Sequence, residues 1–239
     1  MDRRTFVRAG LSSLLTYNCG FARARAATTV YGCMASASEG SFGVAVREEQ
    51  TKFNQRTLGD VRLLASRSSR DFSLRPGIGL YNDRGGPNAL AYPQAFLPNG
   101  PDGTVLVGVN LFDAIVRLKS GSDRKVGLHV LGEFTLPTII SHEFGHIMQY
   151  KRGMSPGDAW QMEPHADFLA GWSLGQSEII RQPPEEVIKA FFNLGDYTFN
   201  DHHHGEKEFR AAMVRIGYDL RDLDVNEAFE RGKQYAGLN

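Results

Sequence analysis

The chain is predicted to fold as one α+β domain, in which a small antiparallel or mixed sheet precedes a mainly helical part. Short apolar runs separated by Gly- and Pro-rich turns fill residues 77–109, which is typical of strands. Helical periodicity prevails from about residue 137 onward. The length of 239 residues, with 41% hydrophobic and 23% charged residues, suits a single globular domain.

Two helices and three strands are expected in the first half of the chain. The helix lies within residues 47–70, where apolar residues recur at helical spacing: Leu58, Val61, Leu64 and Ala65. Turn residues bound three strands, which are expected at Gly77–Tyr81, Ala89–Tyr92 and Thr104–Val109. The run LFDAIVRLK that follows is expected to be helical and to end at Gly121.

Five helices are expected in the second half. The first covers TIISHEFGHIMQYK, with Pro137 in its first turn, and stops before Gly153. The second runs from about Pro164 to Leu174. The others are EEVIKAFFNL after Pro183-Pro184, EKEFRAAMVRIGYDL, and residues 224–235.

The N-terminus resembles a bacterial twin-arginine export signal. Arg3-Arg4 precede a weak apolar stretch that ends at Ala24-Arg25-Ala26, an A-x-A cleavage site. Residues 1–26 are therefore expected to direct export, and residues 27–239 to form the mature periplasmic or secreted domain. The alternative is a basic tail on a cytoplasmic protein. Cleavage would leave Cys33 as the one cysteine, so that no intrachain disulfide could stabilise the domain.

Charge and hydropathy give no indication of a nucleic-acid-binding protein or of a membrane-spanning one. The formal net charge is zero, which gives no indication of a nucleic-acid-binding surface. No run of apolar residues is long enough for a transmembrane helix. The sequence indicates no oligomeric state.

The run SHEFGHIMQY, residues 141–150, carries two histidines four residues apart. On a helix, His142 and His146 lie about 40° apart on one face. Apolar residues fall on the opposite side: Ile140, Phe144, Ile147 and Met148. The helix is therefore expected to bury the apolar stripe in the core and to point its histidines into a cleft.

This pattern suits zinc chemistry. Imidazoles at positions i and i+4 can supply two zinc ligands, and Glu143 between them suits a general base that takes a proton from zinc-activated water. The alternative is an ordinary amphipathic helix that carries two histidines without function.

A third ligand is expected from the next helix. Glu163 follows His146 after a loop able to reverse the chain, and it would complete a His-His-Glu zinc site. Asp167 lies one turn further on the same face. It would accept a hydrogen bond from the ring nitrogen of one histidine that does not bind the metal, and so fix the tautomer of that ring.

Because Pro164 disfavours helical geometry in the residue before it, Glu163 is expected to be the N-cap or to sit at a kink. His165 is then a rival ligand. The alternative for Glu163 and Asp167 is a solvated helix start.

These residues carry a resemblance to a known family. HEFGH (142–146) followed by EPHADFLAG (163–171) resembles the gluzincin zinc metallopeptidases, and most resembles the neutral zinc metallopeptidases of bacteria. A further element of that family, His-Gly-x-x-Glu-x-Arg, is matched by residues 204–210. The resemblance covers about residues 130–218 and implies a zincin-like fold and peptide-bond hydrolysis. It also implies zinc held by His142, His146 and Glu163.

Two further roles follow from the resemblance. His204 is a candidate donor to the oxyanion of the tetrahedral intermediate, and Tyr197 is a second candidate. PNALAYP lies where such enzymes often place a substrate-binding edge strand.

The leading hypothesis is therefore an exported zinc metallopeptidase that acts on peptide or protein substrates, with Glu143 as general base. Two alternatives remain open: a non-catalytic zinc-binding scaffold of the cell envelope, and a zinc amidohydrolase that acts on cell-wall peptides.

Overall fold

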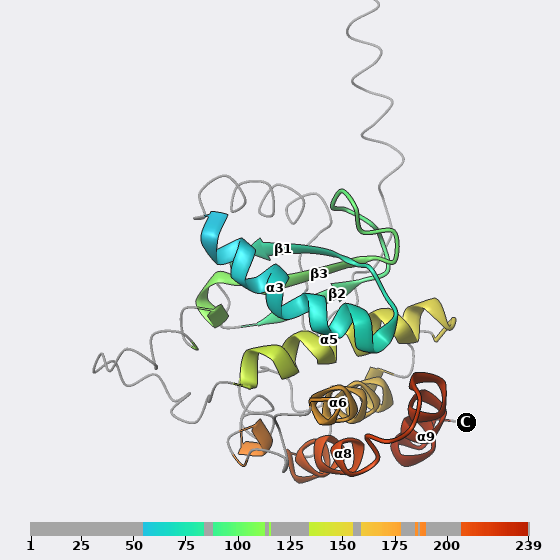
Figure 1. The fold of residues 1–239 in the computed structure, drawn as a ribbon. Coiled ribbons are helices and arrows are strands. Elements are labelled where there is room, and N and C mark those ends of the chain that lie inside the picture. Colours follow the sequence, from blue (N-terminus) through green and yellow to red (C-terminus); the bar gives the residue numbers. More distant parts are fainter. Residues whose placement is uncertain are drawn as a thin grey trace, which may run out of the picture.

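The computed structural model describes residues 55–83, 88–112, 115, 134–154, 159–177, 185, 187–189 and 207–238. The elements, labelled as in Figure 1, follow the chain in this order: α3 (Gln55–Phe72), β1 (Gly77–Tyr81), β2 (Ala89–Tyr92), β3 (Thr104–Gly108), α5 (Thr135–Lys151), α6 (Ala159–Gly175), α8 (Lys207–Asp219) and α9 (Val225–Ala236). The protein is thus α+β, with a small sheet and a larger helical part, as predicted. The export-signal segment, residues 1–26, lies outside the described residues, as does Cys33.

The three predicted strands form one mixed sheet in the order β1-β3-β2. β1 pairs with β3 in parallel, and β2 pairs with β3 in antiparallel orientation. β3 ends at Gly108, one residue earlier than predicted, because Val109 begins a helical segment. The buried Asp83 carboxylate accepts bonds from the backbone N–H groups of Asn110 and Leu111 at 2.7 and 3.0 Å, which stabilises the start of that segment.

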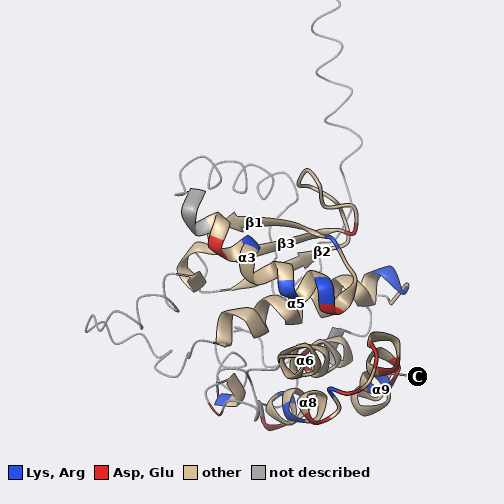
Figure 2. Ribbon diagram, in the orientation of Figure 1, with Lys and Arg blue, Asp and Glu red and all other residues tan. Residues whose placement is uncertain are grey.

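Both faces of the sheet are buried, and successive side chains alternate between them. One face joins the main core with Leu80, Ala89, Ala91, Val105 and Val107. The other face forms a second cluster with Tyr81, Leu90, Tyr92 and Leu106. The strands carry no charged residue, whereas charges of both signs are distributed over α3, α8 and α9 (Figure 2).

Helix α5 is the central element, with the sheet and α3 on one side and α6 on the other (Figure 1). Its apolar side chains Ile140, Phe144 and Ile147 belong to the main core, as the stripe predicted. On its other face, His142 and His146 are each only 3% exposed. The face that carries the histidines packs against α6, so nearly the whole helix is buried.

Helix α6 begins at Ala159, five residues before the predicted start, so Pro164 lies inside the helix. The prediction that Pro164 opens this helix was therefore wrong, and Glu163 is not its N-cap. A proline in a helix removes one backbone hydrogen bond. The packing of α6 between α5 and α8 offsets this cost. Gln149 Nε2 also donates to the Met162 carbonyl of α6 at 2.8 Å.

Glycines allow α5, α6 and α8 to approach closely. A Cβ on Gly171 of α6 would overlap the Val214 carbonyl of α8, and a Cβ on Gly217 of α8 would overlap the Phe168 carbonyl of α6. A Cβ on Gly145 of α5 would lie 3.2 Å from Ala166 Cα. The glycine of the HEFGH run and that of the ADFLAG run therefore serve helix packing.

Hydroxyl groups connect α3, α5 and α6 beside the HEFGH run. Ser141 Oγ, one residue before His142, lies 2.9 Å from Ser68 Oγ and 3.2 Å from Ser173 Oγ. Ser173 Oγ donates to Asp71 at 2.6 Å. These bonds satisfy the buried hydroxyls and fix the rotation of α5 relative to its neighbours.

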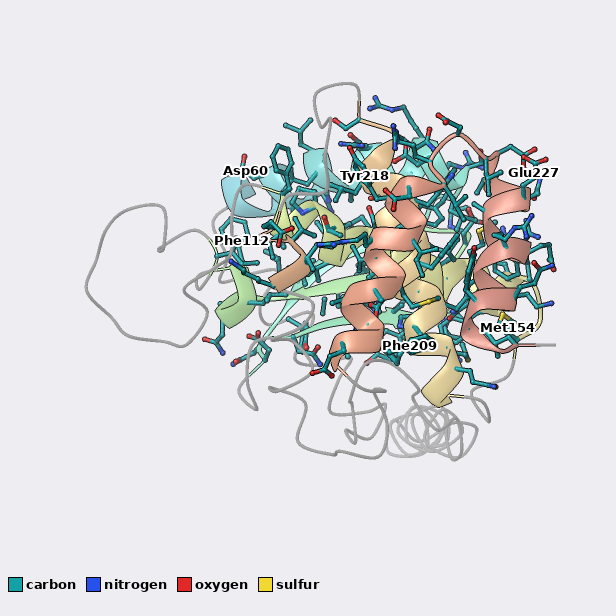
Figure 3. All side chains as sticks on the ribbon, turned by 90° about the horizontal axis from the view of Figure 1, so that it is seen from below. Asp60, Phe112, Met154, Phe209, Tyr218 and Glu227 are labelled. Carbon is teal, nitrogen blue, oxygen red and sulfur yellow. The ribbon has the colours of Figure 1, made fainter. Side chains whose placement is uncertain are left out.

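The last two helices match their predicted positions. Helix α9 begins with a capping box formed by Asp224 and Glu227 and ends at Gly237, whose φ is 73°. Seen from below, α8 and α9 lie side by side, with Phe209 and Tyr218 near the two ends of α8 (Figure 3). Residues 185 and 187–189 are helical, within the predicted third helix. Among the described residues, no helix has the length and apolar character needed to span a membrane.

The close approach of α6 and α8 gives a stability prediction. Gly171→Ala should lower the free energy of unfolding by about 1–3 kcal/mol, because the new methyl group overlaps backbone atoms that cannot move aside easily. Gly59→Ala is the matched control, since Gly59 lies on an exposed face of α3 with open space around it; it should stabilise the protein by up to about 1 kcal/mol. Urea unfolding of both variants measures the difference, and equal values would contradict this packing.

Candidate metal centre

Three buried side chains from two helices converge on one point. His142 and His146 project from α5, and Glu163 projects from α6. The Nε2 atoms of the two imidazoles are 3.0 Å apart, and each lies 3.3 Å from one oxygen of the Glu163 carboxylate. These ligand atoms all lie within 4.8 Å of one another. The structure therefore brings together the three side chains that the sequence indicated as ligands.

The spacing fits a single small metal ion. Ligand atoms about 2.0–2.1 Å from a tetrahedral zinc-sized ion would lie about 3.3 Å from one another. The two nitrogen-to-oxygen distances have that value, and the nitrogen-to-nitrogen distance is slightly shorter. The position of Pro164 inside α6 does not turn Glu163 away from the histidines. The buried His142-His146-Glu163 group could thus bind a metal ion.

Asp167 lies directly behind His142. Its Oδ1 atom is 2.8 Å from His142 Nδ1, so the ring can donate that hydrogen and turn Nε2 toward the metal position. The Arg210 guanidinium of α8 donates two hydrogen bonds to the same carboxylate, at 2.7 and 2.9 Å, in a bidentate ion pair. Burial by itself raises the pKa of Asp167, but Arg210 and His142 outweigh it and hold that pKa below its usual value.

His142 is held by carboxylates on both ring nitrogens. Burial favours its neutral form, but hydrogen bonds to Asp167 and Glu163 outweigh burial and raise the pKa of His142 to about 10. A cationic ring therefore balances the buried carboxylates in the metal-free protein. Binding of a metal ion at Nε2 would displace a proton from this ring.

Glu143 lies beside the two histidines and is only 2% exposed. Burial raises its pKa, while the charges of His142 and His146 act in the opposite direction. Its Oε2 atom has no hydrogen-bond partner among the described residues. Tyr92, the last residue of β2, lies close enough that the Glu143 charge adds to burial in raising the pKa of its hydroxyl. Glu143 is thus a carboxylate with a free oxygen beside the metal-binding group, suited to accept a proton.

His165, the rival ligand, faces away from this group. Its Nδ1 atom is 3.1 Å from Gln149 Nε2, and its Nε2 atom is 3.0 Å from the Phe229 carbonyl of α9. Burial lowers the pKa of His165 to about 3, so the ring is neutral. The expectation of His165 as an alternative ligand was therefore wrong, because both of its nitrogens are already engaged.

One residue of the site, Gln149, was not assigned a role from the sequence. Arg210 was open between joining the last helices to the site through a carboxylate and being a surface arginine. Gln149 Oε1 lies 2.9 Å from His146 Nδ1, and Arg210 joins α8 to Asp167. Gln149 follows His146 by three positions on the same helix, so its place on that face could have been noticed. Arg210 ends the His-Gly-x-x-Glu-x-Arg element but lies 43 residues from Asp167. His204 and Tyr197, the candidate oxyanion donors, lie outside the described residues.

Comparison of the chain with models of protein families, with curated proteins and with solved structures finds no match.

The buried Asp167–Arg210 pair gives a second stability prediction. Arg210→Met should lower the free energy of unfolding by about 3–5 kcal/mol, because it leaves the Asp167 carboxylate without its guanidinium partner. Arg215→Met is the matched control on the same helix, since among the described residues Arg215 makes only an exposed ion pair, with Glu185 at 3.1 Å. Its effect should stay within about 0.5 kcal/mol. Chemical unfolding of the metal-free variants measures both. Similar losses in the two variants would mean that the buried pair contributes no more than a surface pair.

Proposed function

We propose that this chain is an exported zinc metallopeptidase with a zincin-like fold. The single observation that carries the proposal is the convergence of His142 Nε2, His146 Nε2 and the Glu163 carboxylate at spacings of 3.0–3.3 Å, with Glu143 beside them. Two imidazoles and one carboxylate form a ligand set typical of catalytic zinc sites, which keep an open position. Bound zinc would supply Lewis-acid activation of water and of a carbonyl group.

The residues of the chain have separate roles in this proposal. His142, His146 and Glu163 bind the metal. Glu143 takes a proton from the attacking water and passes it to the leaving amine, for which its buried carboxylate with a raised pKa is suited. Asp167 orients His142 and is itself neutralised by Arg210. The oxyanion donor is proposed to be His204 or Tyr197, as the family resemblance implies.

The proposed substrate is a peptide or protein, as the family resemblance implies. β2 is an outer strand in the order β1-β3-β2, and among the described residues it pairs with β3 alone. Tyr92 at its end is a neighbour of Glu143. β2 therefore borders the proposed site, with its four residues buried. The periplasmic or secreted location is proposed from the export-signal pattern in residues 1–26.

The test is hydrolysis of a diverse peptide library by the zinc-loaded protein. Glu143→Gln should lower the rate by about 10²–10⁴-fold with zinc content unchanged, because the amide cannot accept the proton. Glu230→Gln is the matched control, since Glu230 is exposed on α9; it should leave the rate unchanged.

Equal rates for wild type and Glu143→Gln would contradict the proposed general base. Stoichiometric zinc in a wild-type protein that hydrolyses no peptide would favour the envelope scaffold instead. Cleavage restricted to cell-wall peptides would favour the amidohydrolase.

A further inference from the structure

A chain of hydrogen bonds leads from His146 away from the metal-binding group and ends on the C-terminal helix. His146 Nδ1 lies 2.9 Å from Gln149 Oε1, and Gln149 Nε2 lies 3.1 Å from His165 Nδ1. His165 Nε2 lies 3.0 Å from the backbone carbonyl of Phe229 in α9. All three side chains and their bonds are buried. Three helices, α5, α6 and α9, thus contribute to one continuous network.

The chemistry of the last acceptor fixes the direction of every bond. A carbonyl oxygen can only accept, so His165 Nε2 carries the hydrogen and His165 Nδ1 must accept. Gln149 therefore donates from its amide nitrogen to His165, and also to the Met162 carbonyl at 2.8 Å. Its Oε1 atom remains as the acceptor for His146, so His146 carries its hydrogen on Nδ1. The lone pair of His146 Nε2 then faces His142 and Glu163.

Helix α9 packs tightly around the far end of the network. The His165 ring lies edge-on to the Phe229 ring with centroids 4.7 Å apart. A Cβ on Gly232 would lie 2.7 Å from His165 Cδ2. The guanidinium of Arg152, just after α5, lies 4.3 Å from the centre of the Phe229 ring. These contacts hold the accepting carbonyl in place relative to α5 and α6.

We propose that Gln149 and His165 are positioning residues that hold His146 in the Nδ1–H tautomer, and that α9 anchors them through the Phe229 carbonyl. This inference rests on the metal centre of the proposed function. It adds to the three ligands a set of residues, reaching the C-terminal helix α9, that determine the orientation of His146. In the opposite tautomer, His146 would direct an N–H group at the metal position and could not bind an ion there.

The first measurement is made on the metal-free protein by ¹⁵N NMR of the histidine rings at about pH 8, above the ordinary histidine pKa. Wild-type His146 should carry its hydrogen on Nδ1 and His165 on Nε2. In Gln149→Met, which has similar length but neither donor nor acceptor, His146 should lose this single tautomer. The reverse tautomers in the wild-type protein would overturn the inference, even if Gln149→Met fails to fold.

The second measurement is zinc affinity by competition with a chromogenic chelator. Gln149→Met should weaken zinc binding by about 10–100-fold. Gln161→Met is the matched control, because Gln161 also bonds a C-terminal carbonyl, that of Gly237 at 2.8 Å, on the exposed side of α6; it should bind zinc as wild type does.

The outcomes separate this inference from the proposed function. A wild-type protein that binds no zinc would refute the metal centre, while the tautomer measurement would still decide the role of Gln149. Normal zinc binding in wild type, with no change of affinity or tautomer in Gln149→Met, would refute the positioning role alone.

Discussion

A carboxylate is buried where three helices meet, and its charge has to be balanced at that place. Asp167 on α6 is fully buried, and an uncompensated ion in such surroundings costs several kcal/mol. Arg210 of α8 and His142 of α5 both contact it at 2.7–2.9 Å, so each partner ties its own helix to α6. The glycines at the helix crossings permit this, because Gly171 and Gly217 leave room for the backbones to approach. Close packing and the buried ion pair therefore depend on each other.

The metal-binding group follows from the same constraint. Both imidazoles are held through their far nitrogens, His142 by Asp167 and His146 by Gln149, and their Nε2 atoms are left facing each other beside Glu163. A core that served stability alone would gain nothing from three convergent polar groups, since burying them costs free energy. Placing the two orienting partners on different helices makes the geometry of the site a property of the helical part as a whole, including α9.

Local patterns predicted the three strands and most helix boundaries, because the short apolar runs ALAY and TVLVG between turn residues, and the spacing in α5, reflect packing that each element meets independently. They also indicated His142, His146, Glu163 and Asp167, whose i,i+4 pairs lie on single helix faces. The start of α6 was missed because the intrinsic cost of Pro164 is outweighed by tertiary contacts such as that of Gln149 with the Met162 carbonyl. The partner of His165 could not be predicted, since Phe229 lies 64 residues away and takes part through its backbone.

The central claim is that Glu163, and not His165, completes a metal site with the two histidines. Its most direct test is the zinc content of purified wild type, Glu163→Ala and His165→Ala after loading with excess zinc and removal of the unbound ion. The account predicts stoichiometric zinc in wild type, loss of zinc in Glu163→Ala, and retention in His165→Ala because that ring faces α9. Loss of zinc in His165→Ala alone, with zinc retained in Glu163→Ala, would contradict it.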